Sequence, residues 1–88
     1  MPEEHGAPTV TVKVFAPNST EPTEFTFEKT EKVGAAAETA ASQLGFQGQL
    51  VTFQDKEDRV LDRDKPLVAE HVRDGDELEL VDIGGGVA

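Results

Sequence analysis

The sequence contains no cysteine among its 88 residues, and no apolar run in it approaches the length needed to span a membrane. The missing cysteine excludes disulfides, zinc–thiolate sites, iron–sulfur clusters and thiol catalysis. A small domain without covalent staples suits a reducing cytoplasm, which is the location we expect. The N-terminus also lacks the basic and then apolar pattern of a signal peptide. A single small domain is therefore expected, near the size at which one core is only just sufficient.

Positive charge is scarce: the sequence has 8 Lys and Arg residues but 18 Asp and Glu residues, which gives a formal net charge of −10. This imbalance argues against nucleic acid and anionic membranes as partners. It favours basic protein surfaces approached with electrostatic steering. Simple solubility is the explanation that composition alone favours, so charge selects no partner by itself.

Two alternating runs open the ordered part of the chain, at Thr9 to Phe15 and at Thr23 to Lys29. Each run places apolar residues on one face, the period of a half-buried strand. The segment 16–22 between them is rich in turn residues, so the pattern predicts a β-hairpin. The side chains expected to face the core are Val10, Val12, Val14, Phe25 and Phe27.

Apolar residues then follow helical spacing from Val33 to Leu44. Thr30 is expected to cap the start of this helix, with Glu31 favourably placed near the positive end of the helix dipole. Gly45 is expected to end the helix in the left-handed conformation, and Phe46 to fold back on the last turn.

The second half returns to strands, predicted at Gln49 to Gln54, as a short strand at Arg59 to Asp62, and at Glu77 to Ile83. A turn at Asp74-Gly75 precedes the last strand. The element order predicts an α+β fold, a mixed four- to five-stranded sheet with one helix packed across it. Residues expected to plug the underside of the core are Leu67, Val68 and Val72.

Charged and titratable residues suggest no catalytic or metal site and no bound cofactor. The acidic run from Asp55 to Asp64 is interleaved with Lys and Arg, which favours a solvated, salt-bridged face over a metal centre. Asp74-Gly75-Asp76 lacks the ligand count and spacing of a calcium loop. His71 has no partners for a catalytic triad and is expected at or near the surface.

The chain ends with three glycines, Gly84, Gly85 and Gly86, followed by Val87 and Ala88. Glycines have no side chain to pack, so residues 84–88 are expected to leave the domain as a narrow, flexible arm. Such an arm can enter a slot that excludes ordinary side chains, although a frayed end is the simpler explanation of the glycines alone. We expect residues 1–8 to be a disordered lead and residues 9–83 to form the domain.

The element order, the glycine tail and the segment Asp74-Gly75-Asp76-Glu77-Leu78-Glu79-Leu80 together resemble the β-grasp fold of ubiquitin-like proteins. The resemblance covers roughly residues 9–86. The final third, with Leu61-Asp62 ahead of that segment, also resembles ubiquitin-like proteins of bacterial operons that encode ubiquitination-like enzymes.

This resemblance implies a protein modifier without catalytic residues of its own. A processing peptidase would remove Val87 and Ala88 and expose Gly86. An E1-like activating enzyme, using ATP and magnesium, would adenylate the new carboxylate and pass it to a cysteine. An E2-like conjugating enzyme would then deliver it to target proteins, in a bacterial pathway of the defence type. The modifier itself is expected to be a monomer.

Two departures from ubiquitin bear on recognition. Asp82 and Ile83 stand where ubiquitin has a longer, basic arm, so an activating enzyme tuned to a basic tail should discriminate against this chain. Ubiquitin's apolar recognition patch maps to Thr52, Glu79 and Val81, and this predicts an acidic partner surface. Lysines that could accept a further copy to form chains are Lys13, Lys29, Lys32, Lys56 and Lys65.

Two other functions fit the same residues. A sulfur carrier would bear a thiocarboxylate on its terminal glycine, but such carriers end at the glycine pair, and Val87-Ala88 count against this function. A non-covalent adaptor would bind a basic partner through its acidic sheet, with an inert tail.

Overall fold

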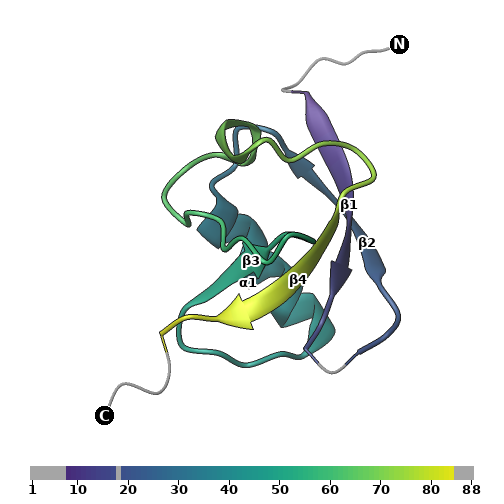
Figure 1. Ribbon diagram of the computed structural model, residues 1–88, viewed down its shortest axis with the longest axis vertical. Helices are drawn as coiled ribbons and strands as arrows, with labels where there is room; N and C mark the ends of the chain where they lie inside the picture. The colour runs from purple at the N-terminus through teal and green to yellow at the C-terminus, as the bar shows by residue number, and fades with distance from the viewer. Residues whose placement is uncertain (1–7, 18, 85–88) are drawn as a thin grey trace.

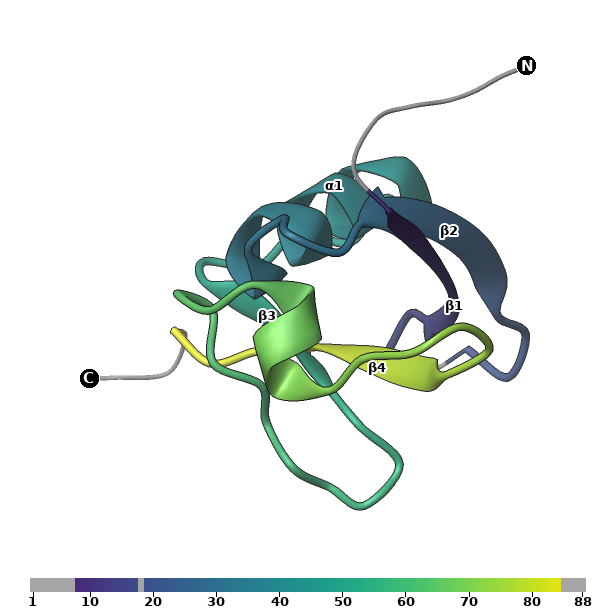
Figure 2. The same ribbon diagram turned by 90° about the horizontal axis from the view of Figure 1, so that it is seen from above.

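A four-stranded mixed sheet curls around one α-helix in the computed structural model, which describes residues 8–17 and 19–84 (Figure 1). The strand order is β2-β1-β4-β3, with β1 and β4 parallel and the other pairs antiparallel. Seen from above, the helix lies on the concave side of the sheet (Figure 2). The elements are β1 Thr9–Phe15, β2 Thr23–Glu28, α1 Val33–Leu44, β3 Val51–Gln54, a 3₁₀ helix Leu67–Glu70 and β4 Glu77–Asp82.

The first hairpin has the predicted form. Thr9 pairs with Glu28 and Val14 with Thr23, and this register aligns the inward faces of β1 and β2. The three valines of β1 are fully buried, whereas on β2 Phe27 is buried and Phe25 is half-buried. Alternation therefore sets which face meets the helix, as expected for a sheet that is solvated on its other side.

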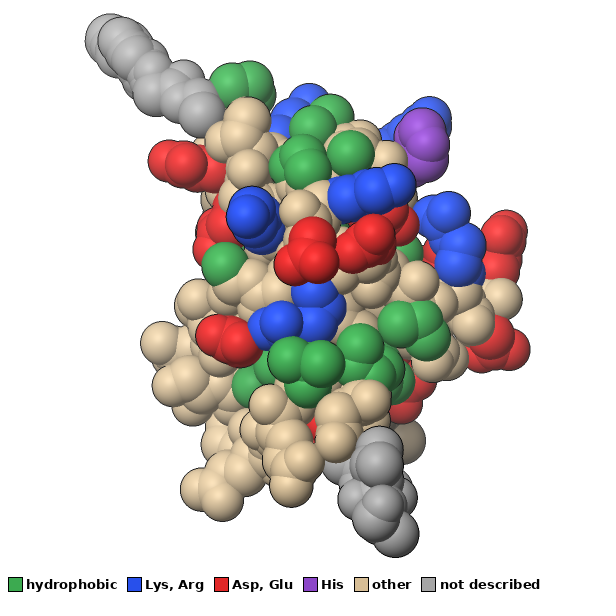
Figure 3. All heavy atoms as spheres, turned by 90° about the vertical axis from the view of Figure 1, so that its left-hand side faces the viewer, with side chains coloured by type: hydrophobic (Ala, Val, Ile, Leu, Met, Phe, Trp, Pro, Cys, Tyr) green, Lys and Arg blue, Asp and Glu red, His purple; other side chains and the backbone are tan. Residues whose placement is uncertain are grey.

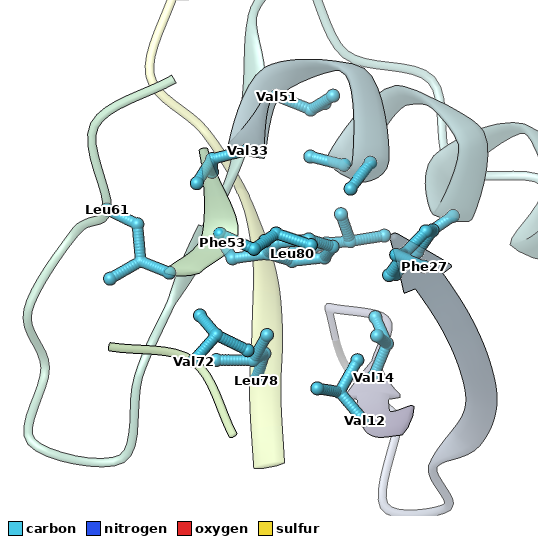
Figure 4. Close-up of a cluster of buried hydrophobic side chains, with 14 of the residues drawn as sticks. Val12, Val14, Phe27, Val33, Val51, Phe53, Leu61, Val72, Leu78 and Leu80 are labelled. Atoms are coloured by element: carbon cyan, nitrogen blue, oxygen red, sulfur yellow. The ribbon is translucent and has the colours of Figure 1, made fainter. Parts of the chain in front are cut away.

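The core forms where the inner faces of β1, β3 and β4 meet the helix (Figure 4). Phe53 and Leu80 are fully buried register partners at its centre, and the Phe53 ring lies 6.3 Å from that of Phe27. The helix contributes mainly alanines to this contact, which lets its backbone lie close to the sheet. Leu67 and Val72 close the core from below, as predicted, but Val68 is 49% exposed and does not.

The two ends of α1 differ in how well their sequence predicts them. Gly45 adopts φ 75° and Phe46 N donates to Ala41 O at 2.9 Å, which confirms the predicted C-terminal cap. The predicted cap at Thr30 is wrong, because the helix begins after Lys32 and no side chain caps it. Backbone carbonyls from the 63–65 segment accept hydrogen bonds from the first helical amides instead, at 2.9 and 3.0 Å.

The predicted strand at residues 59–62 is also absent, because only an isolated bridge joins Val60 to Gln54. The segment nevertheless runs along the edge of β3, since Leu61 N donates to Phe53 O at 2.9 Å. After Leu61 a turn, in which Lys65 N donates to Asp62 O at 3.2 Å, takes the chain away from β3 before a longer ladder forms. The sheet therefore has four strands, the lower of the two expected numbers.

Arg63 joins this segment to the rest of the domain. Its Nε donates to Val51 O at 2.7 Å and its guanidinium forms an ion pair with Glu38 of α1 at 2.5 Å. The guanidinium also lies against Gly34, where an added Cβ would meet Arg63 Cζ at 2.8 Å. The salt-bridged face predicted from sequence thus contains one residue that fixes the helix to β3. Among the described residues no helix is long and apolar enough to cross a bilayer.

Candidate functional site

The end of β4 is where the predicted glycine tail begins, and Asp82 organises it. Its Oδ2 accepts a hydrogen bond from Gln49 N at 3.1 Å. Its Oδ1 accepts hydrogen bonds from Leu50 N at 3.1 Å and from Gly84 N at 3.0 Å. One carboxylate therefore joins the loop before β3 to the first glycine of the tail, and an ionised acceptor makes such hydrogen bonds stronger than neutral ones.

Gly84 lies directly against Leu50. A Cβ at position 84 would come within 2.5 Å of Leu50 Cβ, closer than real Cβ atoms approach a neighbour, and within 3.2 Å of Leu50 N. Ile83 N also donates to Leu50 O at 2.8 Å, so the two segments of the chain are also hydrogen-bonded beside this contact. Gly84 has no left-handed φ, and its lack of a side chain is required here by space.

Gly85, Gly86, Val87 and Ala88 lie outside the described residues, as do residues 1–7 of the expected lead. Their roles therefore remain predictions.

Beside the described end of the chain, hydrophobic side chains gather on the surface (Figure 3). Leu50 and Ile83 are exposed large hydrophobic residues at this point, 39% and 46% exposed. The tail thus starts from a small apolar area rather than the basic arm of ubiquitin.

The predicted partner surface is only partly assembled. Glu79 is exposed and Val81 half-exposed on the outer face of β4, in agreement with the prediction. Thr52 was expected beside them, but it is fully buried and its hydroxyl donates to Leu61 O at 3.0 Å. The segment returning along β3 covers this position, so the prediction is wrong for Thr52. A partner can contact Glu79 and Val81 but not Thr52.

A pocket of about 290 Å³ opens near Glu79, where β1, β3 and β4 lie side by side. The half-buried ring of Phe15 contributes an apolar wall, and Phe15 is the register partner of Glu79. An ion pair between Lys56 Nζ and Glu77 Oε1, at 3.1 Å, lies among its lining residues. The remaining charged lining residues are the acids Asp55, Asp58 and Glu79. Carboxylates around an aromatic ring favour a cationic side chain.

The five candidate acceptor lysines are spread over the surface. Lys13 lies on the outer face of β1, in register with Glu24 and Glu77. Lys56 is the one engaged in the ion pair described above. Three of the others, Lys13, Lys32 and Lys65, are exposed, and Lys29 is half-buried. The structure brings none of these lysines into a common site with Gly84.

The acidic turn at Asp55 behaves as a structural motif. Hydrogen bonds to Asp55, led by that from Arg59 N, lower the pKa of its carboxyl below the usual value, and the amide of Glu57 contributes too. The described residues contain no group of three or more candidate ligands placed to hold a metal ion. His71 is exposed, with φ 63°, in agreement with its predicted surface position.

Sequence reasoning missed three parts of the tail region: Leu50, the amides that Asp82 binds, and the packing of Gly84. A weak signal existed, since the acidic Asp82 stands just before the glycines, where ubiquitin has a basic arm. Gly48 is a second signal, because a Cβ there would meet Asp82 Cγ at 3.1 Å. Without the fold, neither signal shows that Asp82 contacts Gln49 and Leu50, which lie 33 and 32 residues away in the sequence.

No family model matches the sequence, and no curated protein matches it. Solved structures are similar to it at low identity. The ubiquitin of Caldiarchaeum subterraneum shares 20% identity with a TM-score of 0.71, over 89% of this chain and 100% of that one. A ubiquitin-based designed protein shares 16% identity with a TM-score of 0.75, over 94% of this chain and 99% of that one.

A third similar structure is the ubiquitin-like domain of a type VII secretion system protein of Mycobacterium tuberculosis. It shares 19% identity with a TM-score of 0.65, over 84% of this chain and 98% of that one. The similar structures thus include a ubiquitin, a designed protein and a domain of a secretion system protein. At these identities they establish the architecture. The chain has the ubiquitin-like fold, the α+β arrangement predicted from its sequence.

Proposed function

We propose that the chain is a ubiquitin-like protein modifier of a bacterial, cytoplasmic ubiquitination-like pathway of the defence type. The observation that carries the proposal is the place in the fold at which the run of three glycines begins. The first of three consecutive glycines comes two residues after the last strand of a ubiquitin-like fold ends at Asp82, at the described end of the domain. A glycine terminus suits a reaction that must occur inside a narrow enzyme channel.

The proposed chemistry takes place in the partner enzymes. A processing peptidase hydrolyses the Gly86–Val87 bond and releases Val87-Ala88. The Gly86 carboxylate attacks the α-phosphorus of ATP in an E1-like enzyme, forms an acyl adenylate and releases pyrophosphate, with magnesium balancing the phosphate charge. An enzyme cysteine displaces AMP to form a thioester, which passes to an E2-like enzyme. The amine of a target protein then displaces the thiolate and forms an amide.

The test is the mass of the protein and its adducts in its native host, with its neighbouring genes present. Three chains are compared: the full sequence, a chain ending at Gly86, and a chain ending at Ile83. We expect the first to lose Val87-Ala88, and the first two to appear as adducts with a glycine remnant on target lysines. The chain ending at Ile83 should form none. A single unprocessed mass with no adducts would contradict the proposal.

The pocket beside Phe15 favours one second function, a non-covalent adaptor that binds a basic partner. Four acids around a half-buried ring form a surface that an arginine side chain fits by charge. Binding in this case should weaken with salt, survive deletion of residues 84–88, and fall in Glu79→Gln. Glu28→Gln, on the distant strand β2, is the charge-matched control. A sulfur carrier would instead show a thiocarboxylate on the terminal glycine, detectable by mass.

A further inference from the structure

The tail begins in a seat that is built from two parts of the chain. We propose that Asp82, Leu50 and Gly84 form this seat, that it fixes the direction in which the tail leaves the domain, and that it excludes Gly84 as the reacting residue. The reacting carboxylate then belongs to Gly85 or Gly86. This inference rests on the proposed modifier function and makes it more specific.

The first argument is the hydrogen bonding at Gly84. Its amide is bound by Asp82 Oδ1 at 3.0 Å, and the same oxygen accepts from Leu50 N at 3.1 Å. The neighbouring amide of Ile83 is bound by Leu50 O at 2.8 Å. Two successive amides at the start of the tail are therefore held by groups of the folded domain. Extending Gly84 into a separate enzyme channel would require these hydrogen bonds to break.

The second argument is steric. Gly84 packs on Leu50 so closely that a Cβ would come within 2.5 Å of Leu50 Cβ. Gly48, from the same loop, packs against the Asp82 carboxylate, where a Cβ would lie 3.1 Å from Cγ and from Oδ2. One glycine thus packs on Leu50 and the other on the Asp82 carboxylate that binds Leu50 N. Such close approach accounts for the glycine at position 84 without any role in the reaction.

The third argument is the surface around the seat. Leu50 and Ile83 are both exposed on the domain where the tail leaves it. An activating enzyme must contact the domain at this point if it is to receive the tail. We infer that these two side chains meet an apolar area of that enzyme. An enzyme that receives a modifier with a basic arm would need an acidic area there instead. Holding the tail before binding reduces the entropy lost on association.

The seat is tested first without any enzyme, by ¹⁵N relaxation of the Gly84 amide in the full chain. Its order parameter should be near that of rigid backbone, about 0.8 or more, and should fall below about 0.6 in Asp82→Ala and in Gly84→Ala. The double variant Leu50→Gly/Gly84→Ala removes the Cβ clash and should restore most of the order. A mobile Gly84 amide in the unmodified chain would overturn the seat.

The reacting residue is tested with chains that end at Gly84, Gly85 and Gly86, using ATP–pyrophosphate exchange by the activating enzyme purified from the native host. We expect exchange with the chains ending at Gly85 or Gly86 and none with the chain ending at Gly84. Exchange with the Gly84 chain at the rate of the Gly86 chain would overturn the assignment. If all three chains are inactive, the modifier function and the placement of the carboxylate both fail, and relaxation alone decides on the seat.

The positioning role is separated from a general loss of folding by kinetics. In the chain ending at Gly86, Gly84→Ala should raise the KM for the modifier about tenfold, because the tail must be ordered on binding. The kcat should change little, and Leu50→Gly/Gly84→Ala should recover only part of the low KM, because it removes the clash but also the Leu50 side chain that contacts the enzyme. Glu28→Gln is the control and should leave both parameters unchanged. An equal loss of kcat and kcat/KM with unchanged KM would contradict a positioning role.

Discussion

Asp55 and Asp82 both accept hydrogen bonds from backbone amides through their carboxylates, but the amides lie at different separations along the chain. Asp55 Oδ1 accepts from Glu57 N and Arg59 N, both at 2.9 Å, and so closes its own turn. Asp82 binds the amides of Gln49 and Leu50, more than 30 residues away, together with its near neighbour Gly84. The first motif shapes a turn that can open locally, whereas the second holds the tail to the domain.

The largest difference is expected for Asp82→Ala. Three backbone amides lose a charged acceptor at once, and we expect the free energy of unfolding to fall by about 2 kcal/mol, discounted for the exposure of the site. Urea unfolding measures this change. Asp82→Asn retains one acceptor oxygen and should lose about half as much. Equal stability of Asp82→Ala and the parent would show that solvent replaces the carboxylate at no cost.

Asp55→Ala should cost less, about 1 kcal/mol, because water reaches the amides of the exposed turn. Its effect should also be local. Hydrogen exchange of the Arg59 amide should accelerate, while exchange at the centre of β1 should follow only the small global change. A loss that exceeds that of Asp82→Ala would reverse the comparison and make the turn the more important motif.

These two aspartates also mark how far the sequence predicts the structure. Alternation and helical spacing predicted the hairpin, the helix and its end at Gly45, because those signals lie within neighbouring residues. The cap at Thr30 was predicted wrongly because the helix takes its first hydrogen bonds from residues 63–65. Local propensity contains no information on such distant carbonyls.

The candidate site divides in the same way. The glycines at the end of the chain were evident from sequence, and so was the outward position of Glu79. Thr52 was misplaced because alternation along β3 assumes one solvated face, whereas the segment around Leu61 covers it. The contact of Gly84 with Leu50 depends on the antiparallel pairing of β3 with β4, which no local pattern specifies.

The third prediction concerns how the stability contributed by Asp55 changes with pH. Hydrogen bonds lower the pKa of Asp55 in the folded state, so the stability it contributes is present above the usual Asp pKa and is lost as pH falls through the lower folded value. The difference in unfolding free energy between the parent and Asp55→Asn should therefore be largest near pH 6 and shrink toward pH 3. Urea unfolding across this range measures it. A difference that grows in acid would contradict the hydrogen-bonding account.

The smallest effect is expected at Glu31, where two forces oppose each other. The sequence predicts a favourable interaction with the positive end of α1, but burial, followed by the charge of Glu28, raises the pKa of Glu31. A raised folded pKa means that its contribution to stability is present below the usual Glu pKa and is lost as pH rises through the folded value. Glu31→Gln should then be slightly more stable than the parent at pH 7, by up to about 0.5 kcal/mol.

This advantage should disappear below the usual Glu pKa of 4.5, where the parent carries a proton at the same position. Urea unfolding at pH 7 and pH 3.5 gives the comparison, with Glu28→Gln as a second variant that removes only the repelling charge. Glu28→Gln should reproduce less than the whole gain, since burial is the larger cause. A Glu31→Gln variant that is less stable at pH 7 would show that the helix dipole outweighs burial, as the sequence alone suggested.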